Sequence, residues 1–368
     1  MLLSAPVGES HTLMAQMLAA ELEARPDVES VSIAGDFSVL GPVLNRVLSR
    51  GFGFHLGRVR WSYDLAYLLF SRLQAAQSFG EFALYVLGGT ALAREVRRQR
   101  AHVVVSTYPV MNPVLARLRA AGRIGCPAAA VVAPLGGLAF WVQPALDLHM
   151  TLYSEATATV TRLARGSRVE PVRPLVGPEF FAPGPREQTR AELGVEPDVP
   201  LVLVSGGGWG AGDLTGALET CLTLPGVHAL AVAGRNELLR AELSARYGAE
   251  PRVTVLGFTD RMRDLLWAAD VFISATAGTS CIEAELCGCP VLTYGFAVGH
   301  VRDNTRALAE LGLAQRADTT GELRAAVRAA LAGGRRPIPP LDELPTAAEL
   351  TVALASSRGQ PARLPVPS

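Results

Sequence analysis

Short apolar runs that alternate with amphipathic stretches recur in two successive series, and this pattern constrains the fold more than any other feature of the chain. The first series contains "MLLSAPV", "VESVSIAG", "AHVVVS", "PAAAVVA" and "LDLHMTLYS". The second contains "LVLVSGGG", "VHALAVAGRN", "VTVLGF", "DVFISA" and "CPVLTYG". Apolar strands that are each followed by a helix are typical of a parallel sheet with helices on both faces. The sequence therefore predicts an α/β fold with two Rossmann-like domains that face each other.

The two series are separated by residues 176–200, "VGPEFFAPGPREQTRAELGVEPDVP", which are rich in proline and charge and which we interpret as a linker. The predicted domains are residues 1–182 and 196–335. Residues 336–368 follow as a last helix, "TAAELTVALASS", and a frayed tail. A length of 368 residues also favours two domains over one.

The charge and the cysteine content limit the class of protein. The chain has 34 basic and 34 acidic residues, so no global electrostatic attraction favours nucleic acid. The cysteines have neither the even count of a disulfide framework nor the spacing of a zinc site: Cys126, Cys221, Cys281, Cys287 and Cys289. We therefore expect reduced thiols, no metal and a cytoplasmic location, since the N-terminus also lacks the basic and apolar regions of a signal peptide.

One uncharged segment, residues 124–146, is long enough to suggest a membrane span. It is interrupted by Pro127, Pro134 and Pro144, which break a helix. We therefore expect a buried strand, "AAAVVA", followed by an apolar loop.

A glycine-rich turn, "VSGGGWGAGDL" at residues 204–214, ends the first strand of the second series. Its glycines allow a sharp turn whose free N–H groups, with the following helix N-terminus, suit a phosphate: Gly206, Gly207, Gly208, Gly210 and Gly212. The alternative is a tight strand-to-helix turn that binds nothing.

Two further strands end in residues that suit a nucleotide. Arg235 in "VAGRN" falls at the carboxyl end of a strand, where ligands sit in open α/β sheets. Its guanidinium can hold a diphosphate, or it is an ordinary surface arginine. Gly257 and Phe258 in "GFTDRM" form a loop against which a nucleobase can lie. Met262 begins the following amphipathic helix, and its periodicity favours the core face.

The stretch "SATAGTSCIEAELCGCP" at residues 274–290 contains Ser280 and, three residues later, Glu283, which is the spacing of a capping box. The predicted short helix is stopped by Gly288 and Pro290. Glu283 either caps this helix only or also accepts hydrogen bonds from the vicinal hydroxyls of a ribose. The cysteines here are expected to be small core residues.

The ordered set "SGGGWGAG", "VAGRN", "VLGFTDRM", "SATAGTSCIEAELCGCPVL" and "YGFAVGHVRDN" resembles the donor-binding half of the two-domain transferases that include monogalactosyldiacylglycerol synthases, processive diacylglycerol glucosyltransferases and the MurG peptidoglycan enzymes. "VVVSTYPVMNPVLARL" and "FWVQPALDLHMTLYSEA" extend the match over most of the chain. The resemblance implies a GT-B glycosyltransferase with a UDP-sugar as co-substrate, no other cofactor, and a cleft between the two domains.

What the resemblance implies for the second domain is a donor site. Glu283 matches the acid that holds the ribose, and the glycine turn lies near the phosphates. The other residues in matching motifs are Arg235, Gly257, Phe258, Met262, Gly278, Thr279, Ser280, His300, Asp303 and Asn304. The family's Gln-Glu pair that contacts sugar hydroxyls corresponds to His300 and Val301, so Asp303 and Asn304 are expected to take over that contact.

The resemblance makes the first domain the acceptor domain. "PVGESH" matches the family's turn that ends in Gly-His, with Gly8 kept and Ser10 in place of the second glycine. His11 is thus the candidate base for the acceptor hydroxyl, or a residue beside a helix N-cap with no catalytic task. Trp141 agrees with the family, whereas Ala133 and Leu138 stand where glycolipid synthases carry Asp and His.

The implied reaction is a direct displacement of UDP by the acceptor hydroxyl, with inversion and without a metal. A lipid acceptor would require docking on a membrane, and residues 51–73 mix arginines and aromatics, including Trp61, beside an apolar helix. Ordinary packing of that helix is the alternative. Two other functions stay open: a nucleotide-sugar epimerase of the same architecture, and a non-catalytic sugar-nucleotide or lipid-binding protein.

Overall fold

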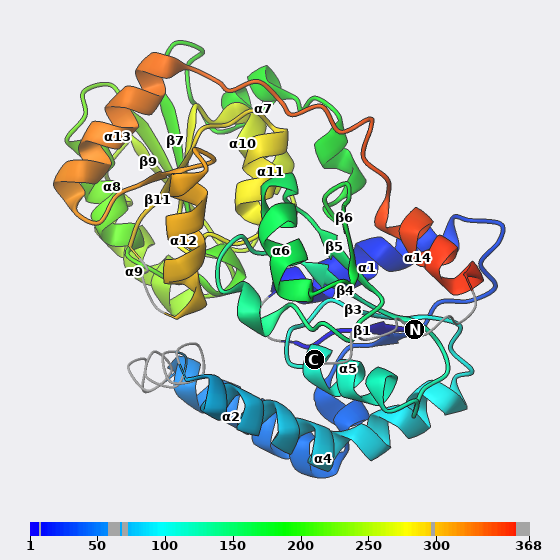
Figure 1. The fold of residues 1–368 in the computed structure, drawn as a ribbon. Coiled ribbons are helices and arrows are strands. Elements are labelled where there is room, and N and C mark those ends of the chain that lie inside the picture. The colour runs from blue at the N-terminus through cyan, green and yellow to red at the C-terminus, as the bar shows by residue number, and fades with distance from the viewer. Residues whose placement is uncertain (7–8, 58–66, 68–72, 296–298, 358–368) are drawn as a thin grey trace. The chain divides into compact units, whose positions relative to one another are not determined.

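The structure is a computed structural model that describes residues 1–6, 9–57, 67, 73–295 and 299–357 (Figure 1). The chain divides into two compact units: unit 1 runs from Met1 to Leu175 and resumes at Leu341, and unit 2 comprises Val176–Pro340. Each unit contains one six-stranded sheet in which every strand pair is parallel. The prediction of two parallel sheets in an α/β chain is confirmed.

The sheet of unit 1 has the strand order β2-β1-β3-β4-β5-β6. Its strands are β1 Leu2–Leu3, β2 Ile33–Ala34, β3 Val104–Ser106, β4 Ala128–Val132, β5 Leu148–Thr151 and β6 Arg168–Pro171. Strands β4 and β5 are buried along their whole length, which explains why both are apolar without alternation. The edge strand β6 was not expected, because "RVEP" has no apolar run.

Helices cover both faces of the first sheet. They are α1 Glu9–Glu23, η1 Phe37–Leu40, α2 Pro42–Gly57, α4 Gln74–Arg98, α5 Asn112–Ala120, η2 Leu138–Phe140, η3 Ser154–Ala156, α6 Thr157–Ala164 and α14 Ala347–Ser356. The predicted last helix, α14, belongs to unit 1, where it packs on α1 and Ala348 donates its N–H to Glu21 Oε2 at 3.3 Å. Its N-terminus forms a complete capping box between Thr346 and Glu349.

The sheet of unit 2 has the order β12-β11-β10-β7-β8-β9. Its strands are β7 Leu201–Ser205, β8 His228–Val232, β9 Val253–Leu256, β10 Val271–Ser274, β11 Val291–Thr293 and β12 Gln315–Arg316. The chain leaves β7 toward β8 and β9 and then returns to build β10, β11 and β12 on the other side. The strand order therefore reverses between β7 and β10, and ligands of open α/β sheets bind at the carboxyl end of such a switch point.

The helices of unit 2 are η4 Pro178–Phe181, α7 Arg186–Glu192, η5 Gly207–Trp209, α8 Leu214–Leu222, α9 Glu237–Tyr247, α10 Met262–Ala268, α11 Ser280–Leu286, α12 His300–Glu310 and α13 Thr320–Gly333. Helices α8, α9 and α13 bury apolar residues in one core with the strands. Helices α7, α10 and α11 lie on the opposite face of the sheet (Figure 1).

The uncharged segment 124–146 forms the buried strand β4 and a loop with the short helix η2, as expected. Across the described residues, no helix combines the length and the apolar composition that crossing a bilayer requires.

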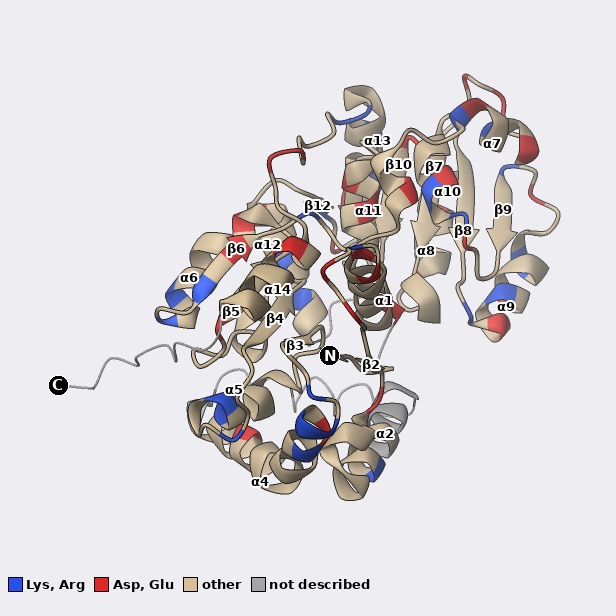
Figure 2. Ribbon diagram, turned by 90° about the vertical axis from the view of Figure 1, so that its right-hand side faces the viewer, with Lys and Arg blue, Asp and Glu red and all other residues tan. Residues whose placement is uncertain are grey.

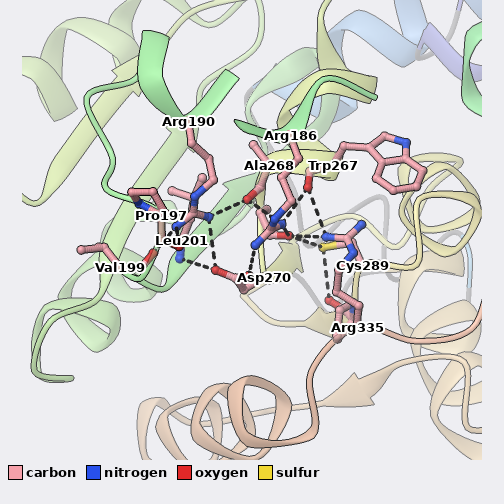
Figure 3. Close-up of polar contacts among 12 residues, drawn as sticks. Arg186, Arg190, Pro197, Val199, Leu201, Trp267, Ala268, Asp270, Cys289 and Arg335 are labelled. Atoms are coloured by element: carbon pink, nitrogen blue, oxygen red, sulfur yellow. Dashed lines mark hydrogen bonds and ion pairs between the residues drawn. The ribbon is translucent and has the colours of Figure 1, made fainter. Parts of the chain in front are cut away.

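Residues 176–200 are not a linker, because α7 lies within them and is anchored to unit 2 (Figure 3). Arg186 Nη1 donates to the carbonyls of Trp267 and Ala268 at 2.8 and 3.0 Å, where α10 ends. Arg190, only 3% exposed, donates to the same Ala268 carbonyl at 2.8 Å. Both arginines pair with Asp270, whose Oδ2 also accepts the N–H of Leu201 at 2.8 Å.

These contacts explain why the prediction of a linker failed. In the sequence, the charged residues of "PREQTR" would be expected to face solvent. In the structure, Arg186 and Arg190 instead donate to carbonyls at the end of α10. Their partner Asp270 lies directly before β10 and accepts the N–H of Leu201, the first residue of β7. Arg335 adds a third guanidinium, which donates to the carbonyl of Ala269 at 2.7 Å and lies 5.1 Å from the ring of Trp267.

We expect Arg190→Ala to lower the free energy of unfolding by about 3 kcal/mol or more, because it removes a buried ion pair and leaves several carbonyls without a donor. Urea denaturation of the full chain measures this. The matched control is Arg246→Ala, which breaks an ion pair with Glu219 whose side chains are 52% and 51% exposed. That variant should lose less than about 1 kcal/mol. Equal losses in the two variants would contradict the structural role of Arg190.

Candidate functional site

The glycine-rich turn lies at the switch point of unit 2, between the carboxyl end of β7 and α8. Gly207, Gly210 and Gly212 have φ of +68°, +58° and +98°, a region that favours glycine. A Cβ on Gly206 would lie 2.3 Å from the carbonyl oxygen of Ala211, and one on Gly210 the same distance from the carbonyl oxygen of Ala233. The glycines therefore permit close backbone packing, as the sequence suggested.

The turn presents donors toward the carboxyl edge of the sheet. The N–H groups of Gly210 and Ala211 are used within the turn, and that of Gly207 bonds to Ser205 Oγ at 3.1 Å. Within the part of the chain that the structure describes, no partner is recorded for the N–H groups of Gly208 and Gly212. Such backbone donors suit an oxyanion.

The N-terminus of α8 is capped by a carboxylate. Asp213 is its N-cap, and Asp213 Oδ1 accepts the N–H of Gly216 at 2.8 Å. Asp213 Oδ2 accepts a hydrogen bond from the Tyr294 hydroxyl at 2.9 Å. A carboxylate therefore satisfies one N–H group at this helix end, and phosphate binding by the turn amides and the N-terminus of α8 stays a prediction.

Arg235 lies beside the glycine turn. Its N–H donates to the carbonyl of Gly208 at 2.8 Å, and its guanidinium carbon lies 3.8 Å from the centroid of the Phe258 ring. Phe258 is 51% exposed and follows β9 together with Gly257. Residues predicted from two separate motifs thus meet in one cation–π contact at the carboxyl edge.

The loop after β10 lies on the other side of the same turn. Gly207 faces Thr276, since a Cβ on Gly207 would lie 3.3 Å from Thr276 Oγ1. The loop is held by two side chains: Ser274 Oγ accepts the N–H of Ala277 at 3.2 Å, and Asn304 Nδ2 donates to the carbonyl of Ala277 at 2.6 Å. Ala277 needs this support because its φ is +48°.

This loop carries Gly278 and Thr279 into α11, which begins at Ser280. The predicted capping box between Ser280 and Glu283 is wrong. Thr279 is the N-cap residue, in a helical conformation without a side-chain cap hydrogen bond, and Ser280 is already inside the helix. The helix does stop at Gly288, whose φ is +65°, as expected.

Glu283 lies in the first turn of α11 and is 8% exposed. Burial, and after it the negative charge of Glu179 on η4, raises the pKa of this carboxyl to about 7. Among the described residues, no hydrogen bond contributes to the pKa of the Glu283 carboxyl. A buried acid with a raised pKa beside the ligand edge of a sheet is a candidate for binding a ligand hydroxyl.

The remaining predicted donor residues lie on α12 and α10. His300 is exposed and Asp303 half-buried in the first turn of α12, whereas Asn304 is buried and holds the loop after β10. Met262 begins α10 and is half-buried, whereas the following Leu265 and Leu266 form its buried face.

The cysteines are free thiols, and four of them are buried. Burial raises the pKa of Cys221, Cys281, Cys287 and Cys289 to about 12, so they are protonated. In the described parts of the chain, no group of three or more His, Cys, Asp or Glu side chains could hold a metal ion.

Unit 1 places His11 at the carboxyl edge of its own sheet, in the first turn of α1. His11 Nδ1 lies 2.9 Å from the carbonyl oxygen of Thr107, just past β3, and Thr107 Oγ1 donates to the carbonyl of His11 at 3.0 Å. Because a carbonyl oxygen only accepts, Nδ1 carries a proton and Nε2 is the basic nitrogen of the neutral ring.

Two aromatic rings orient the imidazole. The His11 ring centroid is 4.9 Å from that of Tyr108, edge to face, and 5.5 Å from that of Trp141. Trp141 is held by Asn112 Nδ2, which donates to its carbonyl at 2.7 Å. Trp141 was predicted from the sequence, whereas Thr107 and Tyr108 were not, although "STYP" lies at the end of a predicted strand.

Other predicted acceptor-side residues are less informative. Ser10 is half-buried next to His11, Ala133 follows β4, and Leu138 is buried in η2. Gly8 and Trp61 lie outside the described residues, as does most of the segment 51–73.

Comparison with known proteins shows which proteins are similar to this chain. Residues 217–333 match the family model described as glycosyl transferases group 1. A probable monogalactosyldiacylglycerol synthase of Glycine max is 30% identical over 146 residues, covering 37% of this chain and 27% of that protein. The match thus spans about a quarter of that relative's length. A processive diacylglycerol beta-glucosyltransferase of Bacillus licheniformis is 21% identical over 319 residues, covering 85% and 82%.

Among solved structures, the crystal structure of Os79 from O. sativa in complex with UDP has a TM-score of 0.60 at 15% identity, covering 97% of this chain and 100% of that one. This likeness concerns the fold and confirms the predicted GT-B architecture. Unit 2 of this chain therefore carries a domain of the glycosyl transferases group 1 family, in a chain of GT-B fold that is homologous to enzymes named as glycosyltransferases.

Proposed function

We propose that the chain transfers a hexosyl group from a UDP-sugar to a lipid or lipid-linked acceptor, by one inverting displacement and without a metal. The observation that carries this proposal is the carboxyl edge of unit 2, where the glycine turn, Arg235 and Glu283 lie on adjoining strand ends. The relatives named as diacylglycerol glucosyltransferase and monogalactosyldiacylglycerol synthase, and the UDP bound to Os79, support it.

The diphosphate of the donor would be held by backbone and guanidinium donors. Gly208 and Gly212 offer N–H groups, and the Arg235 guanidinium lies on the next strand end, stacked on Phe258. These groups favour the charge that develops on the leaving UDP, which is how preorganised donors lower a barrier. No Asp-x-Asp pair occurs in the sequence, which supports a metal-independent departure.

The ribose would be held by Glu283. A carboxylate accepts hydrogen bonds from two vicinal hydroxyls, and among the described residues no hydrogen bond contributes to the pKa of Glu283. The raised pKa of Glu283, at about 7, means that ligand binding must favour its ionised form.

The acceptor hydroxyl would lose its proton to His11. The Thr107 carbonyl fixes the proton on Nδ1, so Nε2 is the ring nitrogen that would take up a proton as the base. Tyr108 and Trp141 limit the rotation of the ring. The loop with Ala133 and Leu138 supplies neither of the polar side chains found in the glycolipid synthases, which favours one alternative, a binding protein that holds UDP without transfer.

Incubation of the full chain with labelled UDP-sugars and a total lipid extract tests the proposed function. We expect label to move into the organic phase with at least one donor, and to do so equally in EDTA. His11→Ala should keep UDP binding and lose transfer by about a hundredfold or more, because general base catalysis contributes that much. A chain that binds UDP but moves no label is the binding protein, and a His11→Ala variant with full transfer removes His11 as the base.

The role of Glu283 predicts a pH dependence. The affinity for uridine, which carries no phosphate to titrate, should rise from about pH 6 to about pH 8 because the accepting carboxylate forms as the pH passes its pKa of about 7. Glu283→Gln should show no such rise, and Glu283→Ala should bind about ten- to a hundredfold more weakly. Glu179→Gln removes the neighbouring negative charge and should move the rise to lower pH. A rise that persists in Glu283→Gln would assign the titration to another group.

Contact with a membrane is part of the proposed function, because the acceptor is a lipid. Helix α4 exposes an apolar face made of Phe79, Phe82, Val86 and Leu87, which are 73%, 52%, 56% and 56% exposed. The Arg117 guanidinium lies 5.9 Å from the Phe82 ring, and Arg97 and Arg98 lie in the last turn of α4. Figure 2 shows basic positions on α4 and α5. Apolar side chains beside arginines suit an anionic bilayer surface.

Co-sedimentation with vesicles tests this surface. The wild type should bind vesicles that contain phosphatidylglycerol more strongly than vesicles of phosphatidylcholine alone, and added salt should weaken the binding. The double variant Phe79→Ser and Phe82→Ser should lose most of it. The control is Leu238→Ser on α9, since Leu238 is 86% exposed but lies in unit 2. Similar losses in both variants would contradict a specific α4 surface.

A further inference from the structure

The glycine turn contains one large side chain. In residues 206–212, "GGGWGAG", the other residues are five glycines and one alanine, so Trp209 alone has a side chain that extends beyond Cβ. Trp209 is 64% exposed, whereas the turn beneath it is mostly buried or half-buried. An indole usually buries much of its large surface in a core or an interface. The proposed donor contacts do not use this side chain.

The exposure of Trp209 is fixed by the backbone. Trp209 ends η5, between Gly207 and Gly210, which both have positive φ. Neighbouring strand ends hold the turn: a Cβ on Gly234 would lie 2.5 Å from the carbonyl oxygen of Gly207, and one on Gly212 would lie 2.4 Å from Ala275 Cβ. A turn packed this closely on both sides keeps the indole at the carboxyl edge of the sheet.

The position of Trp209 determines which ligand group it can meet. It follows Gly208, whose carbonyl accepts the N–H of Arg235, so it adjoins the donors proposed for the diphosphate. In a nucleotide-sugar the pyranose ring is bonded to the distal phosphate. A flat apolar indole with one N–H suits the C–H face of a pyranose ring, which is apolar at its centre and carries hydroxyls at its rim.

We propose that Trp209 is a sugar-binding platform, on which the C–H face of a pyranose ring stacks. The inference rests on the proposed function and adds the residue that recognises the sugar. The pyranose belongs to the donor hexose or to a sugar already present on the acceptor, and both present the same C–H chemistry.

The experiment compares Trp209→Phe, Trp209→Leu and Trp209→Ala with the wild-type full chain. Calorimetry measures the affinities for UDP, UDP-glucose and UDP-galactose, and initial rates measure KM for diacylglycerol and for glucosyl-diacylglycerol. If the ring is the donor's, Trp209→Ala should keep its affinity for UDP within about twofold and lose about tenfold or more for a UDP-hexose. If it is the acceptor's, only KM for glucosyl-diacylglycerol should rise by about tenfold or more.

The other variants and the fluorescence distinguish stacking of the sugar on an aromatic ring from contact with apolar volume alone. Trp209→Phe should retain most of the sugar affinity and Trp209→Leu should not, because leucine has apolar volume without a flat ring. Wild-type tryptophan emission should change on binding the sugar-bearing ligand beyond the change caused by UDP, and Trp209→Phe should lack that extra change. These results support the platform.

Three results would overturn it. The first is that Trp209→Ala changes neither the affinity for a UDP-hexose nor the KM for glucosyl-diacylglycerol. The others are full function in Trp209→Leu, or loss of UDP affinity itself in Trp209→Phe. A wild type that binds no uridine nucleotide refutes the proposed function and the platform together. A wild type that binds UDP refutes the platform alone if Trp209→Ala matches it in both the affinity for a UDP-hexose and the KM for glucosyl-diacylglycerol.

Discussion

The close approach of backbone segments at the carboxyl edge of β7 is the constraint on which the rest of unit 2 depends. Gly206, Gly210 and Gly234 each lie where a Cβ would be within 2.5 Å of a carbonyl oxygen. Only glycine removes that clash, and the same lack of side chains leaves N–H groups open to an oxyanion. Packing and ligand binding therefore require the same residue type at the same positions.

The charged side chains at the two edges of the sheet in unit 2 have different surroundings. At the amino edge, Arg186 and Arg190 pair with Asp270 and donate to helix-end carbonyls, which stabilises the start of β7 and β10. At the carboxyl edge, Glu283 is buried with a raised pKa of about 7, and Arg235 is stacked on an exposed ring. A buried charge that is paired, like that of Arg190, is structural, whereas a buried acid with a raised pKa at the ligand edge of a sheet, like Glu283, is a candidate for binding a ligand.

The alternation of apolar runs and helices was sufficient to predict both sheets, because parallel strands buried on two faces leave a strong signal in sequence. The short edge strands β6 and β12 have no such signal, since "RVEP" and "QR" are polar. The prediction for residues 176–200 failed because Arg190 pairs with the Ala268 carbonyl and with Asp270, which are 78 and 80 residues away in the sequence. Ser280 and Glu283 have the spacing of a capping box, but the support of Ala277 by Asn304 sets the entry into α11 instead.

Candidate site residues could be predicted from the sequence where a single strand is followed by a local motif. Contacts between residues from two different strand ends could not be predicted in this way. Gly207, Arg235 and Glu283 each follow a recognisable run, so their common edge could be inferred from strand topology. The contacts of His11 with Thr107 and Tyr108 join residues 96 and 97 positions apart, and local sequence does not encode such a pairing.

The nature of the His11 contact has a consequence for the proposed chemistry. The Thr107 carbonyl orients the ring and selects the tautomer as a carboxylate would, but it brings no negative charge to stabilise the imidazolium that forms during proton transfer. Under the proposed function, the leaving-group donors around the glycine turn, where the backbone is most tightly constrained, would stabilise the charge that develops on the departing UDP.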